Sequence, residues 1–151
     1  MSWTELEEAM VARLKDVLGD AVRAVYTTAE YADLEENSQV TPAVAVIYQG
    51  YAPVSTPGAM YGAKVQQIEK TFYVVTSVRN ALNTRTSDGA RQASAPLVNQ
   101  ILRGLTGWRP KDLPDEGPLQ LAPATGAAFT DAGYAYYPIA FTNRRTIRGI
   151  D

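Results

Sequence analysis

The amino-acid sequence predicts an α+β fold, in which a mainly antiparallel sheet has two main helices packed on one face. Two stretches place apolar residues three or four positions apart, which is typical of amphipathic helices. Other segments alternate apolar and polar residues or form short apolar runs, as strands do. The resulting order is helix, strand, strand, long strand, helix, strands, and this order favours α+β.

The first helix is expected at the start of the chain. Ser2 and Glu5 have the spacing of a capping box, which satisfies the first backbone N–H groups of a helix. Gly19 ends the segment. Between them one apolar stripe is formed by Trp3, Leu6, Met10, Leu14 and Val17.

Three strands are expected before the second helix. A short one lies within "AVRAVYTT", and "TPAVAVIYQGY" is a nearly unbroken apolar run from Pro42 to Gly50, typical of a central strand buried on both faces. The prolines and glycines of "APVSTPGAMYG" predict a loop. In "AKVQQIEKTFYVVTSVRN" the first half is polar, so we expect a long strand whose start projects beyond the core.

The second helix is expected within "TSDGARQASAPLVNQILRGL", where Leu97, Ile101 and Leu105 recur every four residues. Pro96 cannot donate a helical hydrogen bond. The helix therefore either starts near Ser87 and kinks, or begins near Ala95 after a short turn.

The last third returns to strand patterns. In "YAYYPIAFTNRRTI" the two faces alternate, and Pro138 favours an edge or a bulge. We expect a single domain over residues 1–151, with a flexible basic tail at about 143–151.

Composition excludes several kinds of chemistry. The chain has neither Cys nor His, which removes disulfides, thiolate metal sites, Cys nucleophiles and Ser-His-Asp catalysis. No Walker loop, dinucleotide glycine pattern or nucleophile elbow is present. We therefore expect no enzyme, no catalytic residue, no cofactor and no metal site. The acidic start does not resemble a signal peptide, and no apolar run is long enough to span a bilayer, so we expect an intracellular protein without a membrane partner.

Charge is unevenly distributed along the chain. Residues 1–39 contain nine acidic and three basic side chains, whereas residues 40–151 contain seven acidic and eleven basic ones. The net charge of −2 gives no reason to expect tight binding to nucleic acid. An acidic part and a basic part would give a head-to-tail oligomer complementary faces.

Several residues are candidates for a partner interface. Tyr51 and Tyr61 flank the Pro/Gly loop that contains Pro53, and the arginines near the end of the chain favour an electrostatic contact with an acidic neighbour. The full candidate set is Tyr51, Pro53, Tyr61, Arg79, Arg109, Arg144 and Arg145.

The stretch "GWRP" after the second helix has two interpretations. Either Gly104 or Gly107 supplies a left-handed residue that ends the helix, and Trp108 folds back over Leu105 or Ile101. The alternative is a ligand platform formed by the tryptophan and Arg109.

The order of elements and "TGWRP" at the end of the second helix resemble the tail terminator proteins of Mu-like bacteriophages and, more distantly, those of lambda-like siphophages. The resemblance covers most of residues 3–147. It implies a ring, typically a hexamer, that sits on the last turn of the tail tube, stops its polymerisation and offers a surface for joining the head.

The partners that the resemblance implies are further copies of the chain, the tail tube protein and a head-tail connector or neck protein. Genomic DNA would pass through the lumen without specific binding. The protein would lie at the head-proximal end of the virion tail after assembly in the host cytoplasm. Two alternatives stay open: another head-tail joining or neck protein, and a carboxylate- or metal-dependent small-ligand module.

Overall fold

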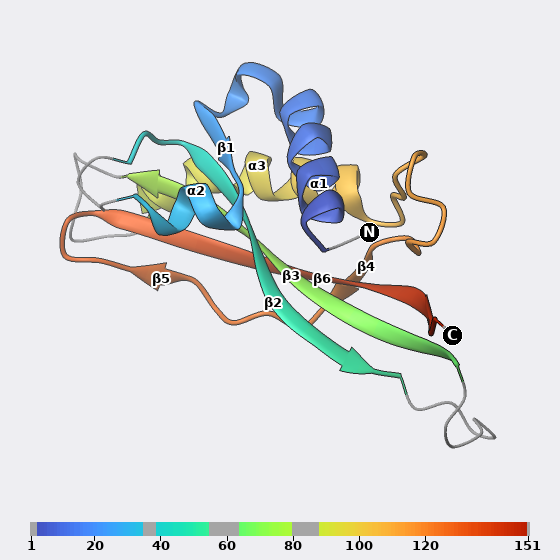
Figure 1. The fold of residues 1–151 in the computed structure, drawn as a ribbon. Helices are drawn as coiled ribbons and strands as arrows, with labels where there is room; N and C mark the ends of the chain where they lie inside the picture. The colour runs from blue at the N-terminus through green and yellow to red at the C-terminus, as the bar shows by residue number, and fades with distance from the viewer. Residues whose placement is uncertain (1–2, 35–38, 55–63, 80–87, 151) are drawn as a thin grey trace.

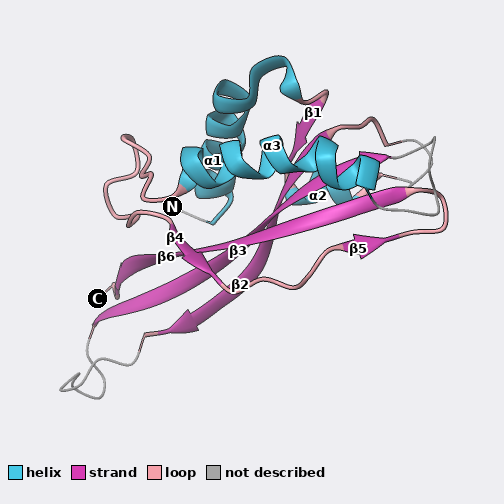
Figure 2. Ribbon diagram, turned by 180° about the vertical axis from the view of Figure 1, so that it is seen from behind, coloured by secondary structure: helices cyan, strands magenta, loops and turns pink. Residues whose placement is uncertain are grey.

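The computed structural model describes residues 3–34, 39–54, 64–79 and 88–150. Figures 1 and 2 show a long, twisted sheet with both main helices on one of its faces. The prediction of an α+β fold with two main helices on one face of a mainly antiparallel sheet is confirmed.

The first main helix, α1 (Trp3–Leu18), runs into a 3-10 turn, η1 (Gly19–Ala21). Of its predicted apolar stripe, Leu6, Met10 and Leu14 are buried, and Trp3 and Val17 are partly buried. The second, α3 (Asp88–Leu105), is continuous, and Pro96 lies inside it. The alternative that begins the helix near Ala95 is therefore wrong. A short helix, α2 (Thr28–Ala32), starts with a capping box formed by Thr27 and Glu30.

The sheet has the order β1-β2-β3-β6-β4, and β5 pairs with β6 beside β4. Its strands are β1 (Ala24–Tyr26), β2 (Ala43–Pro53), β3 (Val65–Arg79), β4 (Gln120–Ala122), β5 (Ala128–Phe129) and β6 (Tyr134–Arg148). Only the β1–β2 pair is parallel among the strands of the described residues. The predictions of a central β2 and of a long β3 are both confirmed.

Two predicted boundaries are wrong because the strands continue further than their local composition indicates. Ala52 and Pro53, expected in a loop, pair with Glu69 and Ile68 and belong to β2. Residues 143–148, expected in a flexible basic tail, pair with residues 65–70 of β3 and belong to β6. Hydrogen bonding to a long neighbouring strand thus orders segments that have few apolar residues of their own.

Pro138 lies where β6 lacks an outer neighbour. On that side β4 pairs with Thr142 to Ala140, and β5 pairs with Tyr136 and Ala135. The gap between these short strands accommodates a residue that has no N–H to donate. The predicted preference of Pro138 for an edge position is confirmed.

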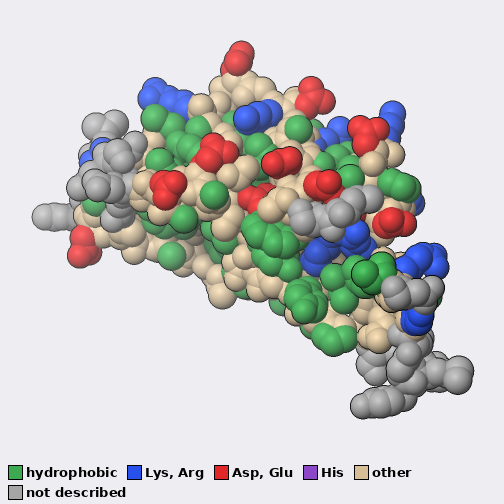
Figure 3. Space-filling view, viewed as in Figure 1, with side chains coloured by type: hydrophobic (Ala, Val, Ile, Leu, Met, Phe, Trp, Pro, Cys, Tyr) green, Lys and Arg blue, Asp and Glu red, His purple; other side chains and the backbone are tan. Residues whose placement is uncertain are grey.

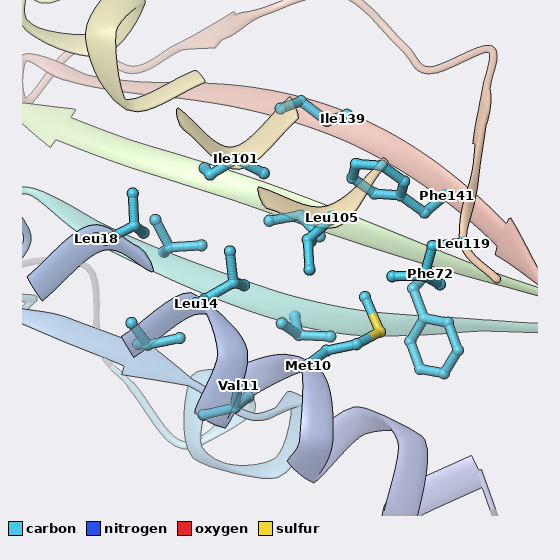
Figure 4. Close-up of a cluster of buried hydrophobic side chains, with 14 of the residues drawn as sticks. Met10, Val11, Leu14, Leu18, Phe72, Ile101, Leu105, Leu119, Ile139 and Phe141 are labelled. Carbon is cyan, nitrogen blue, oxygen red and sulfur yellow. The ribbon is translucent and has the colours of Figure 1, made fainter. Parts of the chain in front are cut away.

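The core lies between the helices and one face of the sheet. Figure 4 shows Leu14 from α1, Leu105 from α3 and Phe72 and Phe141 from the sheet pointing into one cluster, and all four are fully buried. The opposite face of the sheet, which neither main helix covers, has small buried residues such as Ala45 and Ala140 beside the half-buried ring of Tyr73.

A β-bulge divides β2 into two parts. The pairing with β3 shifts by one residue between Tyr48 and Gly50, and Gly50 has a φ of +107°. Before the bulge, Val46 and Tyr48 face the helices. After it, Tyr51 pairs with Lys70 and takes over that face.

Candidate partner-binding surfaces

The sheet continues beyond the helical layer as a three-stranded extension, which we call the arm. It consists of the end of β2 (residues 51–53), the start of β3 (residues 65–69) and the end of β6 (residues 144–148). Figure 1 shows it as the tapering part of the sheet on the side of the C-terminus. Large apolar side chains are exposed there: Tyr51 is 66% exposed, Val65 51% and Ile147 39%. Exposed aromatic and aliphatic side chains on a projecting sheet are typical of a surface that meets a partner.

The side of the arm that Tyr51 shares with the helices is slightly hollowed. The hollow has a volume of about 470 Å³, and its walls include Tyr51, Ile68 and Ile147. Lys64 and Gln66 complete it at the end of the arm. It is open to solvent and has no convergent set of acids and bases among the described residues.

A buried charged cluster joins the base of the arm to the loop after α3. The carboxylate of Glu116, 1% exposed, accepts hydrogen bonds from Lys70 Nζ at 2.6 Å and from Asn143 Nδ2 at 2.6 Å. Arg145 Nη1 lies 3.5 Å from the same carboxylate. Burial is the main cause that lowers the pKa of Lys70 below its usual value; Glu116 opposes this, and Arg145 adds to it. The cluster holds the loop against β3 and β6.

The loop itself is attached to β6 through its backbone. Gly117 N donates to Arg144 O at 2.8 Å, and Glu116 forms an isolated bridge with Arg145. These bonds position the Glu116 side chain between the two strands. The stretch "PDEGP" contains no local sign of this arrangement, because its partners lie 27 to 46 residues away.

The end of α3 is closed by Gly107, not Gly104. Gly107 has a φ of +74°, its N–H donates to Leu119 O, and Leu119 N donates back to Trp108 O. Gly104 stays inside the helix, where it lies against Val17 of α1. Trp108 packs against the core from the outside, with the guanidinium of Arg13 5.9 Å from its ring centre. The fastening role expected for Trp108 agrees with this packing, and α1 supplies the cation above the ring.

An open groove lies between α1 and residues 108–113. Its volume is about 740 Å³. The α1 wall presents Glu5, Glu8 and Asp16, and the facing wall includes Trp108 and Asp112. In the view of Figure 3 acidic side chains are scattered over the helical layer with some Lys and Arg among them, and further Lys and Arg side chains gather near the base of the arm.

Within the described residues, no group of three or more Asp or Glu side chains is arranged to hold a metal ion. The acidic segment around Glu30 and Asp33, a possible source of metal ligands by composition, has Glu30 engaged in the helix cap instead. No helix in the described part of the chain is long and apolar enough to cross a membrane.

The chain matches the protein-family model described as phage tail terminator protein over residues 6–150. The chain belongs to the phage tail terminator family. No curated protein matches the sequence. The family is one of structural tail proteins of bacteriophages, so the resemblance found in the sequence is confirmed at this level and the protein is a component of the virion tail.

In this member of the tail terminator family the predicted interface residues do not form one site. Tyr51, Pro53, Arg144 and Arg145 all lie on the arm, although Arg145 reaches into the buried Glu116 cluster. Arg144 is exposed and pairs with Glu69 at 3.2 Å. Their assignment as contact residues stays a prediction.

The other candidates of this terminator lie elsewhere. Arg79 is at the far end of β3, with its guanidinium 5.2 Å from the centre of the Tyr134 ring. Arg109 is exposed, and its side chain donates to Pro114 O at 2.7 Å, so it bonds to its own loop. Tyr61 lies outside the described residues.

A first prediction concerns the closure of α3 in the terminator. Replacing Trp108 by alanine is expected to lower the free energy of unfolding by about 1–3 kcal/mol, because a half-buried ring loses its contacts with the core and with Arg13. Urea denaturation measures the effect. Trp108→Phe, which keeps an aromatic ring, should recover part of the loss, and an unchanged stability of Trp108→Ala would refute the fastening role.

Proposed function

We propose that this tail terminator forms a ring, typically of six copies, on the last turn of the tail tube. The ring ends polymerisation of the tube and offers the surface to which the head is joined. Its partners are further copies of the chain, the tail tube protein and a head-tail connector or neck protein. Genomic DNA passes through the lumen without specific binding. The ring is assembled in the host cytoplasm and lies at the head-proximal end of the tail.

The observation that carries this proposal, beyond family membership, is the arm. Its three strands extend past the helical layer and expose Tyr51, Val65 and Ile147 to solvent. In an isolated monomer these apolar side chains stay in contact with water, whereas in a closed ring they are buried against a neighbouring subunit. The basic side chains of the arm also remain away from a DNA channel if they lie in contacts between subunits, where they cannot hold back the genome.

The ring is tested by light scattering and by electron microscopy of negatively stained particles, with and without tail tubes. Annular particles of about six subunits, and tubes that stop growing at one end, are expected. A protein that joins heads to finished tails without stopping tube growth would instead be another neck protein.

A prediction for the arm follows from the exposure of Tyr51. Tyr51→Ser should leave the stability of the monomer nearly unchanged, because the side chain is 66% exposed. It should weaken assembly by roughly 30-fold or more at each contact, as loss of a central interface tyrosine does. Light scattering across a dilution series measures this.

The matched control is Phe129→Ser, which removes a similarly exposed ring (56%) from β5, outside the arm. Assembly of this control should resemble that of the parent. Equal losses from both variants, or none from Tyr51→Ser, would count against the arm as a contact.

A further inference from the structure

We infer that the arm of one copy binds in the groove between α1 and residues 108–113 of the next copy. This inference rests on the proposed ring and names the contact that closes it. The two surfaces are different and lie on different parts of the molecule, as a head-to-tail contact in a ring requires.

Charge is the first argument. Among the described residues the arm and its end have four basic side chains, Lys64, Arg144, Arg145 and Arg148, against one acidic side chain, Glu69. Arg144 pairs with Glu69 and Arg145 with the buried Glu116, so the positive charge presented to a partner comes mainly from Lys64 and Arg148. The groove has four acidic side chains, Glu5, Glu8, Asp16 and Asp112, against two basic ones. Opposite net charges on the two surfaces favour their encounter and fix which surface meets which.

One of the two basic side chains that line the groove is already engaged within the chain. Arg13 donates from Nε to Gly104 O at 3.1 Å and lies over Trp108. Its charge is thus directed toward the end of α3. Glu8 and Asp16 are both exposed on the outer surface of α1. An incoming cation therefore meets mainly carboxylates.

Shape is the second argument. The α1 wall has Ala9 and Ala12 between its acidic residues, which leaves room for large side chains to approach the helix. The arm supplies such side chains, because Tyr51 and Ile147 are exposed on one side of it, where they line the hollow. Apolar contacts in the middle with charges around them are the usual composition of a specific interface.

The contact joins two molecules and not two parts of one. In both ribbon views the arm extends away from the helical layer to which α1 belongs (Figures 1 and 2). The arm therefore does not reach the groove of its own chain, but it can bind the groove of a neighbouring copy. Repetition of one such contact builds a closed ring when the rotation per subunit closes.

The test reverses the charge of each surface in a separate variant. The arm variant is Lys64→Glu with Arg148→Glu, chosen because both residues lie at the end of the arm and outside the Glu116 cluster and the Glu69–Arg144 pair. The groove variant is Glu8→Lys with Asp16→Lys, on the exposed surface of α1. Each variant alone places like charges in the contact, so self-association should weaken by roughly tenfold or more. Circular dichroism verifies that both variants stay folded.

The decisive sample is an equimolar mixture of the two variants. An acidic arm then meets a basic groove, and a basic arm meets an acidic groove, in strict alternation. A ring with an even number of subunits permits this alternation, so the mixture should recover assemblies of the parent mass. Lys15→Glu with Arg103→Glu is the control for the arm variant, because it makes the same change in net charge at exposed helix residues outside both surfaces. This control should assemble like the parent.

The outcomes separate this contact from the ring itself. Parent rings with undiminished assembly of either variant, or a mixture that fails to recover, would overturn the contact between arm and groove. An arm variant that still forms rings but no longer caps tubes would assign the arm to the tube protein instead. A parent that stays monomeric at all concentrations, with and without tubes, would overturn the ring and this contact with it.

Discussion

Replacing Glu116 by alanine is expected to lower the free energy of unfolding by about 3–5 kcal/mol. The carboxylate is 1% exposed and is the hydrogen-bond acceptor for Lys70 Nζ and Asn143 Nδ2. Its removal leaves the buried ammonium of Lys70, 2% exposed, without its counterion. Urea denaturation followed by circular dichroism, at one protein concentration for all variants, measures the change.

Two further variants isolate the cause. Glu69→Ala removes a carboxylate from the exposed pair with Arg144, one position away along β3, and should cost less than about 1 kcal/mol. Adding Lys70→Met to Glu116→Ala should restore part of the stability, because the unpaired buried charge is then gone. A double variant less stable than Glu116→Ala alone would show that the loss comes from packing of the loop and not from charge.

The second large effect is expected in the core. Leu105→Ala should lower the free energy of unfolding by about 2–5 kcal/mol, because a fully buried side chain is lost from a cluster made by both helices and the sheet. Leu121→Ala is the matched control: this leucine is 51% exposed on β4, and its loss should change stability by no more than about 0.5 kcal/mol. Similar losses from the two variants would mean that α3 does not pack on the sheet as described.

The elements whose signal is local are predictable from sequence. The spacing of Leu97, Ile101 and Leu105 indicates burial of one helix face, and the alternation along "YAYYPIAFTNRRTI" indicates two faces of a strand. Pro138 is informative in the same way, because a missing N–H restricts where the residue can sit. Each of these signals depends only on residues that lie close by in the sequence, within one or two helical turns or a few positions along a strand.

Features that depend on distant partners are not predictable in this way. Arg145 lies both in the predicted strand "YAYYPIAFTNRRTI" and in the predicted basic tail, and only its distant partners decide between them: Arg145 pairs with Ile68 of β3 and approaches Glu116. The sequence likewise leaves the choice between Gly104 and Gly107 open. Leu119 decides it, because its backbone bonds to residues 107 and 108.

The single extra residue in β2 has a consequence for how such a surface can change during evolution. Side chains alternate strictly along a strand, so the extra residue before Gly50 exchanges the two faces of the sheet for every residue on its C-terminal side. If the same residues paired with β3 without the bulge, Tyr51 would lie on the opposite side of the sheet, while Val44 and Val46 would keep their places in the core. The face on which the arm presents Tyr51 can thus change without a change in the core residues, so the arm can bind a different partner while the fold is kept.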